Sequence, residues 1–379
     1  MPHSAPELTC WLLDTRTLWP GDKISDAVSP SPYALQSQWL TEYKKQASTA
    51  LPLISEAEQH NVRNKYHVSD ARMTLGSALL KRYYIAHTLG VPWSDISFTR
   101  RGDVRHGKPC YLSTASTNSS AGSRKRVDFN VSHQAGLVAL IGACWSVDED
   151  EAGKEGEEAS PEVAVGIDIT CVNERNDYAK IDAEGFDGWM DTYAEFFSED
   201  EIWDMKYTLP QPLTLLDGST VSEEELGRLD RCVTRDKEVA VTLRNGETRT
   251  FSSDLIVDAK LRRFYTFWGY KEAFIKLTGE AMMAPWLRDL EFRNVKAPKQ
   301  GTVPRCSTHG VWGERVSDAE VYVHDERVED VSVEIQAFEE DFMIAVAVRP
   351  QERLGESGIP KLERVDVEDI LAAAESGGV

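Results

Sequence analysis

Glu272, Lys276 and Asp168 are the residues whose types and positions suggest chemistry. Glu272 and Lys276 are four residues apart in residues 261–280, LRRFYTFWGYKEAFIKLTGE, where bulky apolar residues recur at helical spacing. Residues four apart share one side of a helix, so this carboxylate and this ammonium lie in line with two aromatic rings. The same order also favours a simple ion pair worth about 0.2–0.5 kcal/mol.

Asp168 is an acid in an apolar run, VAVGIDIT, residues 163–170. The β-branched side chains of this run are typical of a buried strand. An ionised carboxylate there is costly unless a positive charge compensates it, and a bound cation does so well. Oxygen ligands without His or Cys suit Mg²⁺, which usually takes one or two carboxylates plus phosphate oxygens. The alternatives are that Asp168 caps a loop or pairs with an arginine.

Size, charge and cysteine content limit the classes of protein to which the chain can belong. Its 379 residues are enough for two domains or a duplicated one. The net charge of −21 argues against nonspecific nucleic-acid binding and against an anionic membrane surface. The chain shows no apolar stretch of membrane-spanning length, no basic and apolar leader, and no C-x-x-C pair among its six cysteines. We therefore expect a soluble cytoplasmic protein with reduced thiols.

Composition divides the chain into halves. The stretch DEDEAGKEGEEAS is acidic and of low complexity, so it cannot bury apolar surface, and residues 148–162 are predicted to be a linker. The linker separates an N-terminal half, residues 1–147, from a C-terminal half, residues 163–350. Residues 351–379 are a polar C-terminal tail with a short helix predicted over residues 367–374.

Local patterns predict the elements of the N-terminal half. A strand is expected over residues 9–14, and helices over residues 55–89 that end at Gly90. Residues 127–133 alternate like a strand, and residues 136–145 are predicted to be its antiparallel neighbour. The buried side of the long helix is marked by three leucines: Leu75, Leu79 and Leu80.

The C-terminal half is patterned less evenly. Ser198 and Glu201 have the spacing of a capping box, which predicts a helix start. Residues 207–258 form an insertion with a hairpin around Asn245-Gly246. Three further strands are predicted: 320–324, 331–338 and 342–348.

Basic and polar residues of the N-terminal half suggest an anion site. Four basic residues flank a glycine-containing loop, which suits a phosphate and equally suits a soluble loop: Arg100, Arg101, Arg105 and Lys108. Ser132 and His133 lie at a strand end, where ligands are often met, although a lone His is more often structural. The helix also carries charges that favour a solvated face: Arg72, Lys81 and Arg82.

The motifs taken together resemble a known family. VGIDI at 165–169 followed by FWGYKEAFIK at 267–276 resembles the paired signature of the 4′-phosphopantetheinyl transferases, in particular the larger type named for the surfactin-synthetase activator. Other motifs match in the family's order: GKP, FNVSH, FFS and LTGEA. The long form GIDITCVNER looks most like the fungal members, and the resemblance covers roughly residues 8–348, outside the linkers and the 207–258 insertion.

The resemblance implies a fold and an activity. It implies an α+β fold, a pseudo-twofold monomer of two similar α/β halves, with coenzyme A and Mg²⁺ bound in the cleft between them. The implied enzyme transfers the 4′-phosphopantetheine arm of coenzyme A to a serine of apo acyl or peptidyl carrier protein domains and releases 3′,5′-ADP. The fungal members serve polyketide synthases, nonribosomal peptide synthetases and the reductase of lysine biosynthesis.

The resemblance also assigns metal and catalytic roles. Asp168 and Glu272 match the family's metal-binding acids, and Lys276 matches the lysine that contacts the pyrophosphate. Glu272, or a water that it orients, is the candidate general base for the carrier serine. Many members carry Glu where this chain has Thr170, so a water or the Thr170 hydroxyl would take that metal position.

Coenzyme A contacts follow by the same analogy. Lys108, Pro109, Ser132 and His133 match residues near the adenosine 3′-phosphate, and Arg72 matches a basic residue of the same pocket. Lys271, next to Glu272, is either a structural contact or a phosphate-side contact.

Other functions and the partner surface remain open. A Mg²⁺-dependent phosphohydrolase would use the same acids with water as the nucleophile, and a non-catalytic coenzyme A binding protein would bind without turnover. Hydrophobic candidates for docking a carrier protein lie in residues 186–206 and 280–288, or they are ordinary core: Trp189, Met282, Met283 and Trp286.

Overall fold

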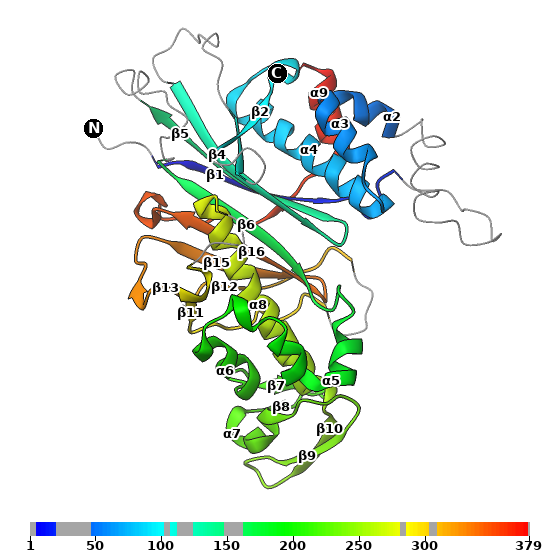
Figure 1. The fold of residues 1–379 in the computed structure, drawn as a ribbon, viewed down its shortest axis with the longest axis vertical. Helices are drawn as coiled ribbons and strands as arrows, with labels where there is room; N and C mark the ends of the chain where they lie inside the picture. The colour runs from blue at the N-terminus through cyan, green and yellow to red at the C-terminus, as the bar shows by residue number, and fades with distance from the viewer. Residues whose placement is uncertain are drawn as a thin grey trace, which may run out of the picture. The chain divides into compact units, whose positions relative to one another are not determined.

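The computed structural model shows an α+β protein whose chain forms two compact units (Figure 1). It describes residues 5–19, 47–101, 107–111, 124–147, 162–280, 286–302 and 309–377. The first unit consists of Met1–Ile169, Phe274–Ala281 and Val346–Val379, and the second of Thr170–Ala273 and Met282–Ala345. None of the helices in these described ranges combines the length and the apolar character needed to cross a membrane.

The first unit contains a sheet, several short strands and helices. Its strands are β1 (Glu7–Asp14), β2 (Phe98–Arg101), β3 (Lys108–Tyr111), β4 (Arg124–Gln134), β5 (Leu137–Val147), most of β6 (Ala164–Cys171) and β17 (Glu363–Arg364). Its helices are α2 (Ala47–Ala50), α3 (Glu56–Arg63), α4 (Val68–Leu89) and α9 (Val367–Glu375).

The central sheet of this unit has the strand order β17-β1-β5-β4. β5 pairs antiparallel with both β1 and β4, as the alternation of residues 127–133 predicts for β4. Ala135 and Gly136 join β4 to β5 with positive φ angles of 46° and 88°, the conformation of a tight two-residue hairpin. The predicted antiparallel pair is therefore confirmed.

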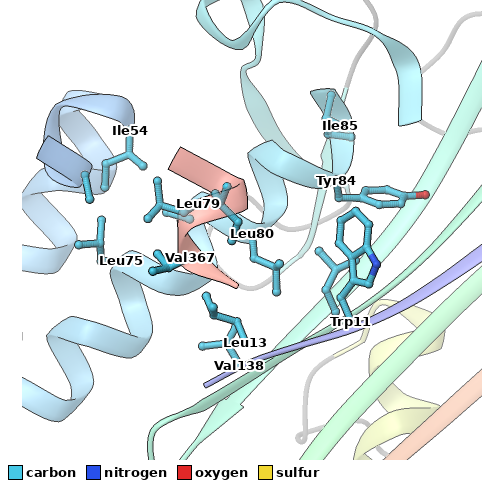
Figure 2. Close-up of a cluster of buried hydrophobic side chains, with 14 of the residues drawn as sticks. Trp11, Leu13, Ile54, Leu75, Leu79, Leu80, Tyr84, Ile85, Val138 and Val367 are labelled. Atoms are coloured by element: carbon cyan, nitrogen blue, oxygen red, sulfur yellow. The ribbon is translucent and has the colours of Figure 1, made fainter. Parts of the chain in front are cut away.

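The core of the first unit lies between α4 and this sheet (Figure 2). Leu75, Leu79 and Leu80 are fully buried, which confirms the predicted buried side of the helix. α4 ends at Gly90, whose left-handed φ of 63° closes the last turn. Val367 of α9 belongs to the same core, and β17 pairs parallel with β1, so the segment after residue 350 contributes to this unit.

The charged residues of α4 differ from expectation. Arg82 is only 5% exposed, and its guanidinium donates to the carbonyl of Ile96 and to Glu58, each at 2.6 Å. Lys81 also lies within 3.8 Å of Glu58. A solvated face was therefore wrong for these two residues, because Glu58 of α3 compensates their charge beneath the surface.

Gly142 of β5 lies against the ring of Tyr84 on α4. A Cβ atom at this position would lie 2.2 Å from Cζ and 2.5 Å from the hydroxyl oxygen of that fully buried ring. We expect Gly142→Ala to lower the free energy of unfolding by about 1–3 kcal/mol, the usual effect of overpacking, measured by urea denaturation. The control is Gly355→Ala, whose nearest neighbour would be 3.8 Å away, and an equal loss there would contradict the explanation.

The second unit contains most of the remaining elements. Its helices are α5 (Asp177–Asp191), α6 (Glu199–Tyr207), α7 (Glu223–Leu226) and most of α8 (Asp254–Thr278). Its strands are β7 (Leu213–Thr214), β8 (Thr220–Val221), β9 (Glu238–Thr242), β10 (Thr248–Ser252), β11 (Leu290–Arg293), β12 (Trp312–Val316), β13 (Glu320–Val323), β14 (Glu326–Arg327), β15 (Ser332–Phe338) and half of β16 (Phe342–Arg349). Further sheets have the orders β12-β15-β16-β6 and β11-β13-β14.

Most predicted features of this unit are confirmed. Ser198 and Glu201 form the capping box that begins α6. The hairpin around Asn245-Gly246 is β9 paired with β10, and it packs on a small apolar core that fills the predicted insertion. The strands predicted at 320–324, 331–338 and 342–348 are β13, β15 and β16.

α8 begins seven residues before the predicted start at residue 261. Its first turns carry a lysine that looks solvent-facing, yet Lys260 is fully buried and donates to the carbonyls of Lys206 at 2.6 Å and Cys232 at 3.1 Å. The helix ends as predicted, because the amide of Gly279 donates to the carbonyl of Ile275 at 3.1 Å with a φ of 82°.

Candidate active site

Asp168, Lys276 and Ser132 form one cluster in the first unit. Asp168 lies within β6 and is 6% exposed. Lys276, near the end of α8, donates to Asp168 Oδ1 at 2.5 Å and to Ser132 Oγ at 3.0 Å. The Ser132 hydroxyl donates to the same Oδ1 atom at 2.9 Å. The structure thus brings three predicted site residues together, and it compensates the buried carboxylate with a lysine, not the arginine considered above.

The Ser132 hydroxyl uses its full hydrogen-bonding capacity. Its single O–H bond is directed at Asp168. Its oxygen accepts from Lys276 and from the backbone amide of Ile169, the latter at 3.3 Å. A hydroxyl has one proton and two lone pairs, so Ser132 is committed to holding β6 and the carboxylate together.

Lys108, which matches a phosphate-binding residue of the family, has partners within the protein. It is 5% exposed, and its ammonium donates to Asp128 and, at 2.6 Å, to the carbonyl of Val165. Burial lowers the pKa of Lys108, and the adjacent Asp128 carboxylate opposes that shift. The lysine therefore holds the backbone of β6. Pro109 follows it in β3 opposite Arg100.

The arginines near Lys108 also have protein partners. Arg100 donates to the carbonyl of Gly107 at 2.7 Å, and Arg101 lies 3.4 Å from Asp128. The first contact ties the end of β2 to the residue before β3, and the second ties β2 to β4. Arg105 lies outside the described residues.

Arg72 and His133 are the remaining candidates for an anion in the first unit. Arg72 on α4 is half-buried and donates to the carbonyls of Trp19 at 3.1 Å and Arg16 at 3.5 Å. His133 follows Ser132 in β4, so its side chain leaves the opposite face of the strand, and the residue is exposed. Although part of the residue is exposed, neighbouring atoms crowd the imidazole ring and reduce its hydration, which lowers the pKa of His133, and the positive charge of Lys276 lowers it further.

The pKa of His133 provides a test of this neighbourhood. Lys276→Met removes the positive charge that lowers the pKa of His133 most, so we expect this pKa to rise, measured by proton NMR of the imidazole. Lys65→Met should raise it less. Because the pKa of His133 is lower in the folded wild type than in the unfolded chain, the unfolded chain binds a proton at this histidine more readily. The contribution of His133 to the free energy of unfolding is therefore fully present above the ordinary His pKa and is lost as the pH falls to the lowered pKa of the folded state. An unchanged pKa in Lys276→Met would contradict the arrangement.

Lys271 and Glu201 form a buried ion pair in the second unit. Their side chains are each 3% exposed, and the ammonium lies 2.9 Å from Glu201 Oε2. Lys271 also donates to the carbonyls of Leu287 and Leu290, while Glu201 Oε1 accepts from the amide of Phe292 at 2.9 Å. Burial lowers the pKa of Lys271 and raises that of Glu201. Lys271 is thus a structural contact in this structure, one of the two alternatives above.

Glu272 and Thr170 complete the predicted set. Glu272 is half-buried on α8, one helical turn before Lys276. Thr170 is 1% exposed, and its hydroxyl donates to the carbonyl of Met343 at 3.3 Å.

Comparison with known proteins identifies the family. Residues 37–145 match the family model described as 4′-phosphopantetheinyl transferase, N-terminal. The chain is 51% identical over 368 residues to the 4′-phosphopantetheinyl transferase of Aureobasidium melanogenum, which covers 97% of each chain. The chain belongs to the 4′-phosphopantetheinyl transferases. This confirms the resemblance drawn from the motifs, and the protein is an enzyme of that class.

Two further fungal relatives have the same family name. This transferase is 32% identical over 358 residues to 4′-phosphopantetheinyl transferase A of Aspergillus fumigatus, covering 91% of this chain and 83% of the relative. It is 33% identical over 337 residues to 4′-phosphopantetheinyl transferase NpgA of Emericella nidulans, covering 86% of each.

The donor atoms at Asp168 suit a hard cation. The transferase has a buried carboxylate there, and carboxylate oxygens are the ligands that such a cation prefers, whereas the lone pairs of the Ser132 hydroxyl are already used. Within the described ranges, no group of three or more His, Cys, Asp and Glu residues could hold a metal. A Mg²⁺ ion that takes one or two carboxylates, waters and substrate phosphates does not require such a group.

The hydrophobic candidates for docking a carrier protein differ in how exposed they are. Trp189 is fully buried and donates to Asp177 at 3.1 Å, so it is core. Trp286 is half-buried, and Met282 and Met283 lie outside the described residues. Trp203 of α6 lies in the predicted segment 186–206, although it was not singled out there, and it is 61% exposed.

Proposed function

We propose that this transferase moves the 4′-phosphopantetheine arm of coenzyme A to a serine of apo carrier domains. The carriers would be those of polyketide synthases, nonribosomal peptide synthetases and a lysine-biosynthesis reductase, in the cytoplasm. The observation that carries the proposal is the Asp168, Lys276 and Ser132 cluster at the motif positions of a chain 51% identical to a protein of that name.

The proposed reaction is a phosphoryl transfer. The serine hydroxyl of the carrier attacks the β-phosphorus of coenzyme A, and a new oxygen–phosphorus bond forms. The bond from that phosphorus to the bridging oxygen breaks, so 3′,5′-ADP leaves with the electron pair. Little covalent work falls to the protein in such reactions, so positioning and charge stabilisation dominate catalysis.

Side chains on α8 would carry most of the chemistry. Glu272, directly or through a water, would take the proton of the serine. Lys276, one turn later, would stabilise the negative charge that develops on the departing diphosphate oxygen. In the structure the ammonium group of Lys276 donates to the buried carboxylate of Asp168. This contact supports a role for Lys276 in stabilising negative charge at the site.

Asp168 and Glu272 would hold Mg²⁺. The two residues are linked through Lys276, which contacts Asp168 and follows Glu272 by one turn of a single helix, and this supports the assignment. The ion would supply neutralisation of the diphosphate. The Thr170 hydroxyl donates its proton to the carbonyl of Met343 and keeps its oxygen lone pairs, so that hydroxyl or a water would take the third position.

The adenosine 3′-phosphate would be bound by Arg72 and His133, with Ser132 nearby. This assignment rests on the motif match and, for His133, on its exposed position near the end of β4. We assign a structural role to Lys108 and Lys271, because both ammonium groups are buried and bind backbone carbonyls and carboxylates of the protein. Pro109 would keep Lys108 in place at the start of β3.

We also propose a monomer of two similar halves with the site in the cleft between them. The similarity is supported by a long helix in each half, α4 with 22 residues and α8 with 25, and by an antiparallel strand pairing in each. Residues 1–147 and 163–350 would be the halves, with 148–162 as the linker.

Intact mass spectrometry of an apo carrier protein tests the function. The carrier is incubated with the transferase, coenzyme A and Mg²⁺, and we expect its mass to rise by one phosphopantetheine arm. Release of inorganic phosphate without a carrier would instead identify a phosphohydrolase. Coenzyme A binding with no change in any carrier would identify a binding protein.

A further inference from the structure

Three alternate side chains of β4 bind three alternate backbone amides of β6. Asp128, Asn130 and Ser132 are 1%, 6% and 6% exposed. The bonds advance in step along both strands: Val165 N–H to Asp128 Oδ2 at 3.0 Å, Ile167 N–H to Asn130 Oδ1 at 3.0 Å, and Ile169 N–H to Ser132 Oγ at 3.3 Å. We call this set of bonds the β4–β6 ladder.

The ladder is explained by the position of β6. In the order β12-β15-β16-β6, β6 is the last strand, so alternate amides and carbonyls on its outer side have no neighbouring strand in that sheet. A buried backbone amide without a partner is costly, by about 1–3 kcal/mol. The side chains of β4 supply acceptors for these amides, and Lys108 supplies a donor for the carbonyl of Val165.

The strand β4 can do this because its residues alternate. Phe129 faces the apolar core of α4, with Val127 and Val131 packed against the same core. The three polar residues between and after them occupy the opposite face. A shift of β4 by one residue would bury the polar side chains in the core and remove the acceptors, so the alternation fixes the register.

The last bond of the ladder ends beside Asp168. Ser132 accepts from the amide that follows Asp168 and donates to its carboxylate. Asn130 holds the amide that precedes Asp168. The backbone on both sides of the carboxylate is therefore held by side chains of β4.

We infer that Asn130 is a positioning residue for the transfer reaction, which acts by holding the backbone of β6 so that Asp168 keeps its direction. The link to catalysis rests on the proposed function, whereas the ladder itself does not. Asn130 contacts no substrate in this account. Its effect is transmitted through the amide of Ile167.

Amide hydrogen exchange tests the ladder without any substrate. Both reporter residues are isoleucines, so [¹⁵N]isoleucine labelling of the full chain makes Ile167 and Ile169 observable by NMR. In Asn130→Leu we expect the amide of Ile167 to exchange at least about tenfold faster, because its acceptor is gone. Ile85 on α4 is the internal reference, and its exchange should not change unless the whole unit opens.

A second variant gives the complementary result. Ser132→Ala should accelerate exchange of Ile169 while Ile167 stays protected. This variant removes one oxygen only, so it keeps the test available if Asn130→Leu does not fold. Asn130→Asp retains an acceptor oxygen and should restore protection of Ile167.

Turnover completes the test. With coenzyme A and an apo carrier, Asn130→Leu should lower kcat by about 10–100-fold with little change in the KM for the carrier, as loss of outer-shell support usually does. Asn130→Asp should recover most of that loss. Val131→Ala, on the opposite face, should destabilise the core and leave kcat unchanged.

The inference is overturned if the amide of Ile167 remains protected in Asn130→Leu, or if Val131→Ala lowers kcat as much. Faster exchange of Ile167 with unchanged kcat would retain the ladder and refute the positioning role. A wild-type protein that modifies no carrier would refute the proposed function and leave the exchange results standing.

Discussion

Asp168→Asn is expected to lower the rate of phosphopantetheine transfer by at least about 10³-fold while the protein stays folded. Charge stabilisation by a metal contributes several kcal/mol, and each 1.4 kcal/mol changes a rate tenfold. The substitution keeps the shape and a hydrogen-bond acceptor for Ser132 and Lys276, so only the negative charge is lost. The measurement is the initial rate of carrier modification at saturating coenzyme A, with circular dichroism as the check of folding.

A second buried aspartate provides the matched control. Asp177 is fully buried and accepts from Trp189 at 3.1 Å and from Tyr265 at 2.6 Å, and neither partner is assigned to coenzyme A or to the metal. Asp177→Asn should lower stability and leave the turnover of the folded protein within about twofold of the wild type. A comparable loss of rate in both variants would show that Asp168 matters only for folding.

Lys271→Met is expected to lower the free energy of unfolding by about 3–5 kcal/mol. Removing one partner of a buried ion pair leaves the other charge uncompensated, and here two backbone carbonyls also lose their donor. The double variant Glu201→Met/Lys271→Met should be more stable than the sum of the single losses predicts. Urea denaturation followed by tryptophan fluorescence measures all three.

An exposed ion pair gives the contrast. Lys296 and Asp318 are 2.5 Å apart, and their side chains are 47% and 49% exposed. Asp318→Asn should cost no more than about 1 kcal/mol. If Lys271→Met instead weakened coenzyme A binding and left stability unchanged, Lys271 would be a phosphate contact after all.

Local signals were sufficient to predict much of the fold. Alternation in residues 127–133, followed by a two-residue turn, predicts β4 and its pairing with β5. Gly90 and Gly279 end the two long helices because both take a left-handed conformation. These features depend on residues close together in the sequence, so periodicity and turn chemistry are enough to find them.

The features that were missed depend on distant partners. The start of α8 includes Lys260, whose charge suggests solvent but whose ammonium meets two carbonyls from other segments. Lys108 matched a phosphate-binding position, yet its partners are Asp128 and the backbone of β6. No spacing rule indicates which carbonyl a long side chain will reach.

In the candidate site, some residues were singled out from the sequence and one was not. The motifs singled out Asp168, Ser132 and Lys276, and the fold brings these three side chains into contact. The supporting role of Asn130 was not anticipated, because an acceptor for a backbone amide can be recognised only when the two strands are seen together. Its signal in the sequence is the polar alternation of β4.

The most direct measurement is Mn²⁺ binding in place of Mg²⁺, followed by electron paramagnetic resonance with coenzyme A present. Both ions prefer carboxylate oxygens, and Mn²⁺ gives a signal that separates free from bound metal. We expect one bound Mn²⁺ ion per chain. The affinity for Mn²⁺ should fall at least about tenfold in Asp168→Asn and likewise in Glu272→Gln. Wild-type binding in either variant would contradict the claim that these two acids share one ion.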